Sequence, residues 1–118
     1  MEKSIVYQKA YAFSIRIVKA FQYIQSDKRE FILSKQLLRS GTSIGANISE
    51  ANGAISQKDF SAKMSIAYKE CLETKYWLSL LKDTDYIDES IFQSLFKDAD
   101  ELGKILFSIL KTTRINKQ

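Results

Sequence analysis

Four carboxylates fall into two pairs, each with the spacing that places both members on one side of a helix. Glu70 and Glu73 form the first pair, and Asp98 and Glu101 form the second. Carboxylate oxygens are the ligands that Mg²⁺ prefers, and four of them converging from facing helices would hold the metal against a triphosphate. The second pair, however, flanks the apolar positions of its own helical pattern. We therefore expect Asp98 and Glu101 to face outward.

The composition excludes most other catalytic centres. The chain of 118 residues contains no histidine, the commonest general base and metal ligand. The single cysteine, Cys71, excludes an intrachain disulfide and is expected to pack as a small apolar side chain. A magnesium-dependent all-α nucleotide pyrophosphatase, whose acidic motifs are similar to the two pairs above, is the remote alternative. We predict a protein that is not an enzyme, with no catalytic residue, cofactor or metal.

The elements that must position these residues are helices. The chain has no proline and only four glycines, which argues against a turn-rich β fold. Helical periodicity predicts helices at about 4–25, 30–52, 57–82 and 88–113 within one domain, 1–118. Short connections imply an all-α, up-down-up-down antiparallel four-helix bundle. No apolar run is long enough to cross a membrane, and the first residues are unlike a signal peptide, so we expect a cytoplasmic protein.

Each predicted helix carries an apolar seam with alternating spacings of four and three residues. Ser56 with Asp59 resembles a capping box for the third helix, and Asp88 is a suitable N-cap for the fourth. Gly41 and Gly45 inside the second helix indicate close approach of a neighbouring helix, because interior glycine weakens a helix. The seam residues are Val6, Ala10, Phe13, Ile17, Ala20, Ile24; Leu33, Leu37, Ser40, Ile44, Asn47, Ala51; Phe60, Met64, Ala67, Cys71, Thr74, Leu78, Leu81; and Phe92, Leu95, Ala99, Leu102, Leu106, Ile109.

Polar residues on one side of the second helix predict a network with the third. Antiparallel register sets Arg39 opposite Glu70, Gln36 opposite Glu73, and Glu50 near Lys58 and Asp59. A partly desolvated Arg–Glu pair adds little net stability but can fix register and partner choice. We expect a structural role for this network, which comprises Gln36, Arg39, Ser43, Asn47, Glu50, Glu70 and Glu73.

The same region carries a family resemblance. Residues 36–51 (QLLRSGTSIGANISEA), Lys58-Asp59-Phe60 and residues 67–78 (AYKECLETKYWL) closely resemble the 23S rRNA intervening-sequence family of small bacterial four-helix-bundle proteins. The likeness extends over nearly the whole chain. One departure is Ala51-Asn52-Gly53, where relatives often have glycine directly after the glutamate.

The resemblance implies a homopentamer associated with nucleic acid. A relative, the accessory variability determinant of diversity-generating retroelements, works with a reverse transcriptase, which makes such an enzyme a candidate partner. The family has no known catalytic residues, so none is carried over. Six residues of the polar network match characteristic family positions and are interpreted as structural: Arg39, Ser43, Asn47, Glu50, Glu70 and Glu73.

The charge distribution indicates where RNA or DNA would bind. The formal net charge is +4, and residues 103–118 contain four cations and no acids. Lysines at seven-residue spacing line one face of the fourth helix, and cations of the first helix extend that face. Such a stripe can track phosphates, although lysines at heptad spacing are also typical of an ordinary solvated face. The candidate nucleic-acid-binding residues are Lys9, Arg16, Lys19, Lys97, Lys104, Lys111 and Arg114.

A second set of apolar positions predicts self-association. The helices carry more apolar surface than the core of one bundle can bury. A small monomer seldom exposes so many large apolar groups in register. The alternative is that each helix has a wide core face. The residues are Tyr7, Tyr11, Val18, Phe21, Ile66, Trp77, Leu80, Ile91 and Ile105. A homo-oligomer is expected, with a pure protein-interaction scaffold as the alternative to nucleic-acid binding.

Overall fold

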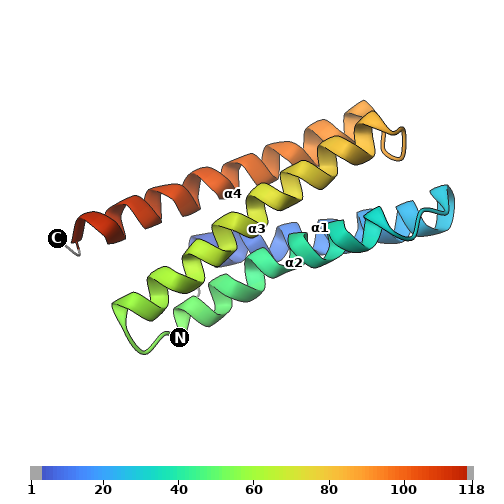
Figure 1. The fold of residues 1–118 in the computed structure, drawn as a ribbon. Coiled ribbons are helices and arrows are strands. Elements are labelled where there is room, and N and C mark those ends of the chain that lie inside the picture. The colour runs from blue at the N-terminus through green and yellow to red at the C-terminus, as the bar shows by residue number, and fades with distance from the viewer. Residues whose placement is uncertain (1–3, 117–118) are drawn as a thin grey trace.

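The computed structural model describes residues 4–116, with side chains described up to residue 113. Four helices follow one another: α1 (Ile5–Lys28), α2 (Leu33–Asn52), α3 (Gln57–Asp83) and α4 (Glu89–Asn116). They form an antiparallel up-down-up-down bundle measuring 48 × 24 × 21 Å (Figure 1). The described residues contain no strand. The predicted fold class is confirmed.

The ends of the helices follow the predicted capping chemistry in most places. The Ser56 hydroxyl accepts a hydrogen bond from the Asp59 amide at 3.0 Å, and Asp88 accepts one from Ile91 at 2.8 Å. The start of the second helix differs from the prediction, because α2 begins at Leu33 rather than at Glu30. Arg29 adopts a left-handed conformation (φ 54°) that ends α1 and turns the chain before α2.

Glu30 is a helix cap rather than a helical residue. Its carboxylate accepts hydrogen bonds from the backbone amides of Ile32 (3.0 Å), Leu33 (2.9 Å) and Ser34 (2.7 Å). A carboxylate at this position satisfies amides that have no partner within the helix and opposes the positive end of the helix dipole. Burial of Glu30 opposes ionisation, but the backbone donors prevail and its pKa is lowered.

The predicted seams form the core. All seam positions of α3 except Phe60 are buried, and α1 departs only at Ala20, which is partly buried. In α2, Leu33 and Asn47 are partly buried, whereas Ser34, Gly41, Gly45 and Ile48 join the core. In α4, Phe92 and Ile109 are partly buried and Leu110 is buried instead. The buried face of α2 is therefore wider than a strict heptad seam.

The glycines of α2 allow α1 to approach closely. A Cβ added at Gly41 would lie 2.8 Å from the Ile17 side chain, and one at Gly45 would lie 3.6 Å from the backbone of Ala10. Ile17 is fully buried, so its side chain can give way only by shifting within the core. Contact between α1 and α4 is the least extensive of the four neighbouring pairs, so the bundle is packed more loosely along that seam.

Candidate functional site

The polar network on the α2–α3 side centres on Arg39. Its guanidinium forms ion pairs with Glu70, at 3.1 Å, and with Glu73. The Trp77 indole also donates to Glu73, at 2.9 Å. Arg39 is 49% exposed, Glu70 18% and Glu73 34%, so water screens the cation more than the carboxylates. The expected pairing of Arg39 with Glu70 is present, but the cation is less desolvated than a buried pair requires.

Three further members of the predicted network form hydrogen bonds within α2. Gln36 accepts a long hydrogen bond from Arg39, at 3.4 Å, instead of contacting Glu73. The side chains of Ser43 and Asn47 donate to backbone carbonyls one turn earlier in α2.

Glu50 has a partner on α3 that was not predicted from the sequence. Its carboxylate pairs with Lys63 at 2.9 Å, and Asp59 also acts on the Lys63 ammonium. Lys63 lies further into α3, where its long side chain can reach back to the last turn of α2. The hydrogen bond from the Lys63 ammonium to Glu50 favours the protonated form, so the pKa of Lys63 is raised.

The two pairs of carboxylates do not converge. Glu70 and Glu73 bind Arg39 on the α2 side of α3, whereas Asp98 and Glu101 contact α1. Asp98 pairs with Arg16 at 2.6 Å, and Glu101 pairs with Lys9 at 2.7 Å. No group of three potential metal ligands occurs among residues 4–113, where side chains are described. This arrangement lacks the four-carboxylate cavity that magnesium-dependent triphosphate chemistry requires.

The predicted basic residues fall into two groups. Lys9 and Arg16 are held in the α1–α4 ion pairs, and the hydrogen bond that the Lys9 ammonium donates to Glu101 raises the pKa of Lys9. Lys104 pairs with Asp100 at 3.1 Å but remains 78% exposed. The others whose side chains are described have no ion pair within that part of the chain and are exposed: Lys19, Lys97 and Lys111. The side chain of Arg114 lies outside the described residues.

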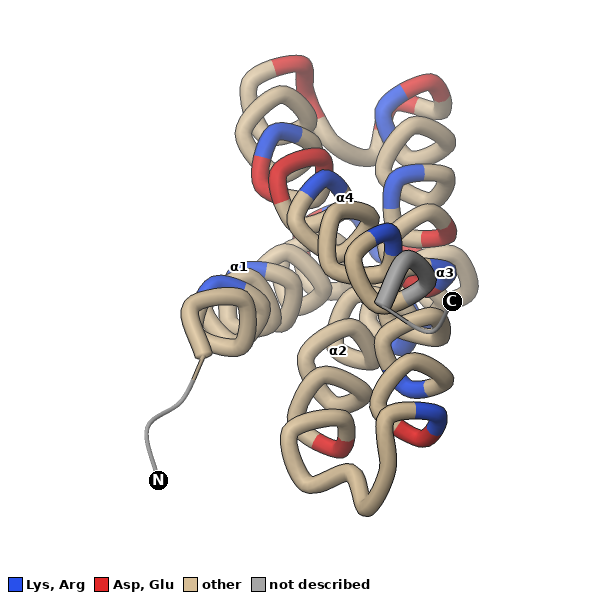
Figure 2. The backbone as a smooth tube through the Cα atoms, turned by 90° about the vertical axis from the view of Figure 1, so that its left-hand side faces the viewer, with Lys and Arg blue, Asp and Glu red and all other residues tan. Residues whose placement is uncertain are grey.

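An exposed basic edge therefore runs along α4. Lys97, Lys104 and Lys111 recur every seven residues, so they lie on one side of the helix over about 21 Å. Figure 2 shows acidic and basic residues side by side over the first part of α4 and basic residues alone towards its C-terminal end. We call Lys97, Lys104 and Lys111 the α4 basic edge.

Sequence reasoning missed the bridge between α3 and α4. Asp100 accepts hydrogen bonds from Lys75 at 2.9 Å and from Lys104, and both hydrogen bonds lower its pKa. The antiparallel register used for α2 and α3, applied around the α3–α4 loop, sets Lys75 opposite residue 97, about one turn from Asp100, so the pairing depends on the reach of the lysine side chain. Cys71 is buried, as expected, and burial raises the pKa of its thiol to about 11.

The sequence model of the 23S rRNA-intervening sequence protein family matches residues 2–108. The chain belongs to this family. A crystal structure from the S23 ribosomal protein family of Bacteroides thetaiotaomicron VPI-5482, described as a protein of unknown function, shares 48% identity with the chain. The match covers 91% of this chain and 99% of that one, with a TM-score of 0.90. No match was found among curated proteins.

Membership in the intervening-sequence family agrees with the resemblance carried by the α2–α3 region. The family match spans all four helices except the last turns of α4, so it extends well beyond the polar network. Within the described residues, no helix is long and apolar enough to span a membrane.

Proposed function

We propose that the chain is a non-catalytic, homo-oligomeric protein that associates with nucleic acid through the α4 basic edge. The observation that carries this proposal is the exposure of Lys97, Lys104 and Lys111 along one side of α4. Lysines there attract phosphates without requiring any base sequence. Membership in a family described by its rRNA intervening sequences supports the same partner class.

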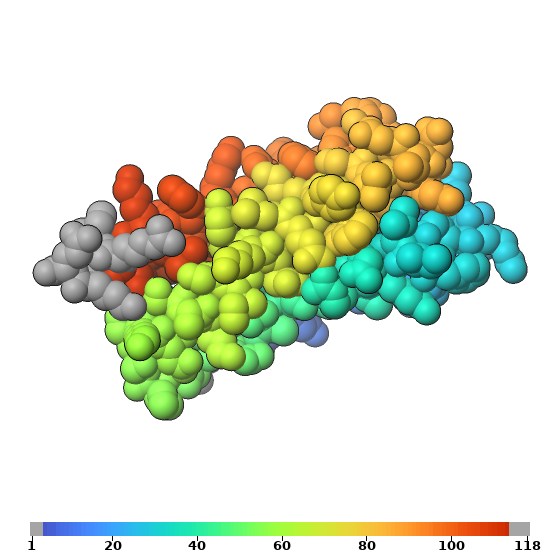
Figure 3. Space-filling model, in the orientation of Figure 1, coloured from blue at the N-terminus to red at the C-terminus, as the bar shows by residue number. Residues whose placement is uncertain are grey.

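Two exposed apolar patches support self-association. The α1 patch contains Tyr11, Ile15 and Val18, which are 57%, 45% and 37% exposed. On α3, Ile66 and Tyr76 are 43% and 60% exposed and lie about 15 Å apart along the outer side of the helix; we call this pair the α3 patch. In Figure 3, α3 lies across the visible face between α2 and α4, so its outer surface is accessible.

The placement of these patches favours a ring. The α1 and α3 helices both flank α2 and lie diagonally across the bundle from each other. Packing the α1 patch of one copy on the α3 patch of the next gives a head-to-tail interface, which closes into a ring when the rotation allows. We propose five copies, as the family resemblance implies. A ring would present one α4 basic edge on each copy, so several edges could contact the phosphates of one nucleic acid.

A protein-interaction scaffold, such as a reverse-transcriptase accessory protein, is the second candidate. The ion pairs of Lys9 and Arg16 favour it, because they neutralise the α1 part of the predicted basic surface. Under this proposal the α4 basic edge contacts an acidic protein and confers no affinity for nucleic acid.

Charge reversal on α4 separates the two candidates. We expect the wild-type protein to bind structured RNA or duplex DNA with an affinity that falls steeply as salt increases. Replacing Lys104 and Lys111 by Glu should abolish that binding while leaving the oligomer mass unchanged. The measurement is binding across a salt series, with the mass recorded on the same samples.

The matched control is a double variant with the same change in net charge at lysines outside α4. Lys35 and Lys58 are exposed on α2 and α3, away from the α4 basic edge. Replacing both by Glu should weaken binding far less than the α4 double variant. Equal losses in the two double variants would mean that net charge alone matters. An intact oligomer that binds no nucleic acid at low salt would favour the scaffold.

A further inference from the structure

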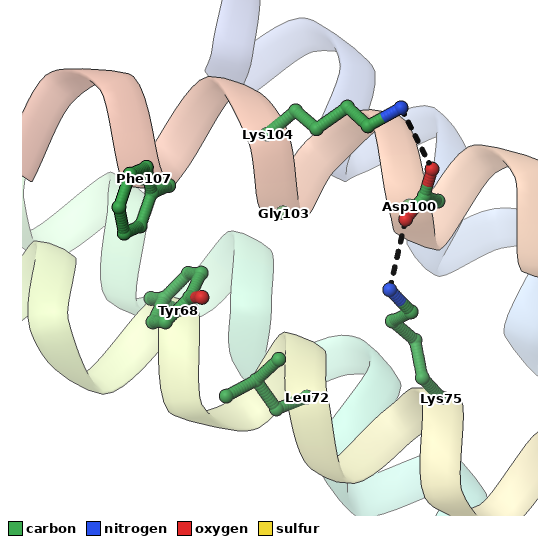
Figure 4. A pocket seen from close by; sticks show the side chains of 7 residues that line it. All are labelled: Tyr68, Leu72, Lys75, Asp100, Gly103, Lys104 and Phe107. Atoms are coloured by element: carbon green, nitrogen blue, oxygen red, sulfur yellow. Dashed lines mark hydrogen bonds and ion pairs between the residues drawn. The ribbon is translucent and has the colours of Figure 1, made fainter.

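A hollow between α3 and α4 combines aromatic and cationic side chains. Its volume is about 370 Å³, and its lining includes Tyr68, Leu72 and Phe107 (Figure 4). The Tyr68 and Phe107 rings lie 6.0 Å apart and are tilted by 48°, and Phe107 is 53% exposed. These two rings form an apolar surface that is open to solvent at one side.

Position 103, which has no side chain, forms part of the lining of the hollow. A Cβ added at Gly103 would lie 3.5 Å from the Cys71 sulfur. At this position the lining of the hollow therefore lies directly above the buried Cys71. A space of this size is at the lower end of small-molecule pockets, which are roughly 300–1,000 Å³. It suits one planar ring better than a whole helix.

The rim of the hollow carries a net positive charge. Lys75 and Lys104 both bind Asp100, at 2.9 and 3.1 Å, so two cations share one carboxylate (Figure 4). Lys111 lies one turn beyond Phe107 on α4 and is exposed. Lys104 and Lys111 belong to the α4 basic edge, so the aromatic surface lies beside the residues proposed to track phosphates.

We propose that this hollow receives an unpaired nucleobase from a single strand of nucleic acid, stacked on Phe107 and Tyr68 while Lys104 and Lys111 contact flanking phosphates. Aromatic platforms beside cationic grooves bind single strands in this way, because every base has a face that can stack. A paired base is already stacked inside its duplex and cannot enter. The inference rests on the proposed function, since it names the form of nucleic acid that α4 would recognise.

Phe107, the ring proposed to stack on the base, lies on α4, whereas the patches proposed for self-association lie on α1 and α3. Ile66 shares a helical face with Glu70 and Glu73, which contact α2, whereas Tyr68 and Leu72 line the α4 side of α3. Tyr76 of the α3 patch lies one turn from Leu72, so a copy packed on that patch would lie beside the hollow, and the oligomer mass of the Phe107 variant shows whether it covers the hollow. The charge of the rim favours a phosphate-bearing ligand over a second copy of this surface, which would bring like charges together.

A double-mutant cycle between Phe107 and the bases tests this inference. The probes are oligothymidylate and an abasic sugar–phosphate strand of the same length. Phe107→Ala should weaken oligothymidylate binding about fivefold or more, the fold-change that corresponds to loss of one stacked base. The same variant should change binding of the abasic strand by no more than about twofold. Binding of oligouridylate, measured in parallel, shows whether the hollow binds RNA as it binds DNA.

Phe31→Ala is the matched control, because Phe31 is 46% exposed in the loop between α1 and α2 and lies outside the hollow. It should leave binding of both strands unchanged. Equal effects of Phe107→Ala on the two strands would overturn the inference while leaving the proposed function intact. So would a fall in oligomer mass caused by Phe107→Ala, because it would show that a second copy covers the hollow. Absence of binding to any strand or duplex would overturn the proposed function itself.

Discussion

Single residues determine where a helix begins and which neighbouring helix it contacts. Glu30 and Arg39 illustrate two different roles for a charged side chain. Glu30 is only 9% exposed, and its carboxylate satisfies three backbone amides. Arg39 is half-exposed and joins two helices by contacts that water and salt can screen. Substitution of either residue should therefore give a distinct dependence on solution conditions.

Glu30→Gln should lower the free energy of unfolding by about 1 kcal/mol at neutral pH, since a cap loses its charge. The pKa of Glu30 is lowered in the folded protein, so its stabilisation is present above the unfolded pKa and is lost as pH falls through the folded pKa. The difference between wild type and variant should therefore disappear in acid. Urea unfolding across a pH series measures it. Glu89→Gln, in the first turn of α4, is the control and should have a smaller effect.

Arg39→Ala should lower the stability of the chain by about 1 kcal/mol, because the ion pairs are only partly desolvated. It leaves Glu70 and Glu73 as two like charges without their cation. The loss should shrink in high salt, where the remaining repulsion is screened. Thermal melting at low and high salt, with the oligomer mass recorded, provides the measurement. An unchanged melting curve and an unchanged mass would contradict the structural role assigned to this pair.

At the scale of elements, the packing of α1 on α2 depends on the absence of a side chain at Gly41. Helix propensity alone favours alanine there by about 1 kcal/mol. The buried Ile17 side chain, only 2.8 Å from an added Cβ, opposes that gain. Helical propensity and interhelical packing therefore act in opposite directions at this position.

Gly41→Ala should destabilise the protein by about 1 kcal/mol net, because overpacking costs about 1–3 kcal/mol and exceeds the gain in propensity. Gly103→Ala in α4 is the matched control, because its nearest contact would be an ordinary 3.5 Å to the Cys71 sulfur. That variant should be neutral or slightly stabilised. Denaturant unfolding of both variants checks the prediction, and stabilisation by Gly41→Ala would show that α1 moves aside easily.

At the scale of the whole molecule, the bundle presents different surfaces on different sides. The α1 and α3 patches are apolar, the α4 basic edge is cationic, and the α1–α4 seam is bridged by ion pairs. A ring built from two different patches would need both of them on every copy. A two-fold dimer built from one patch would need only that patch.

Tyr11→Lys and Tyr76→Lys distinguish these assemblies. Both tyrosines are more than half exposed, so neither change should unfold the bundle. In a head-to-tail ring, each variant alone should fall to the monomer mass of 13.6 kDa. Mixing the two variants should restore one interface and give a mixed dimer but no ring. Light scattering measures the masses, and loss of assembly in only one variant would indicate a two-fold contact instead.

The sequence by itself determined the fold class, the core seams, most of the caps and the pairing of Arg39 with Glu70. These features depend on local periodicity and on the register of two helices joined by a short loop. The family resemblance was also present in the sequence, since the α2–α3 residues carry it. The start of α2 at Leu33 was missed because a cap can lie several residues before the helix that it stabilises.

Only the tertiary structure decided which charged residues remain free. Lys9 and Arg16 meet acids of α4 that lie far away in sequence, and Glu50 pairs with Lys63. Helical phase shows which side of a helix a residue occupies, but its partner depends on interhelical angle, on relative shift and on side-chain reach. The hollow at Gly103 likewise arises only when α3 and α4 pack together. The candidate surface is therefore the part of α4 that those contacts leave exposed.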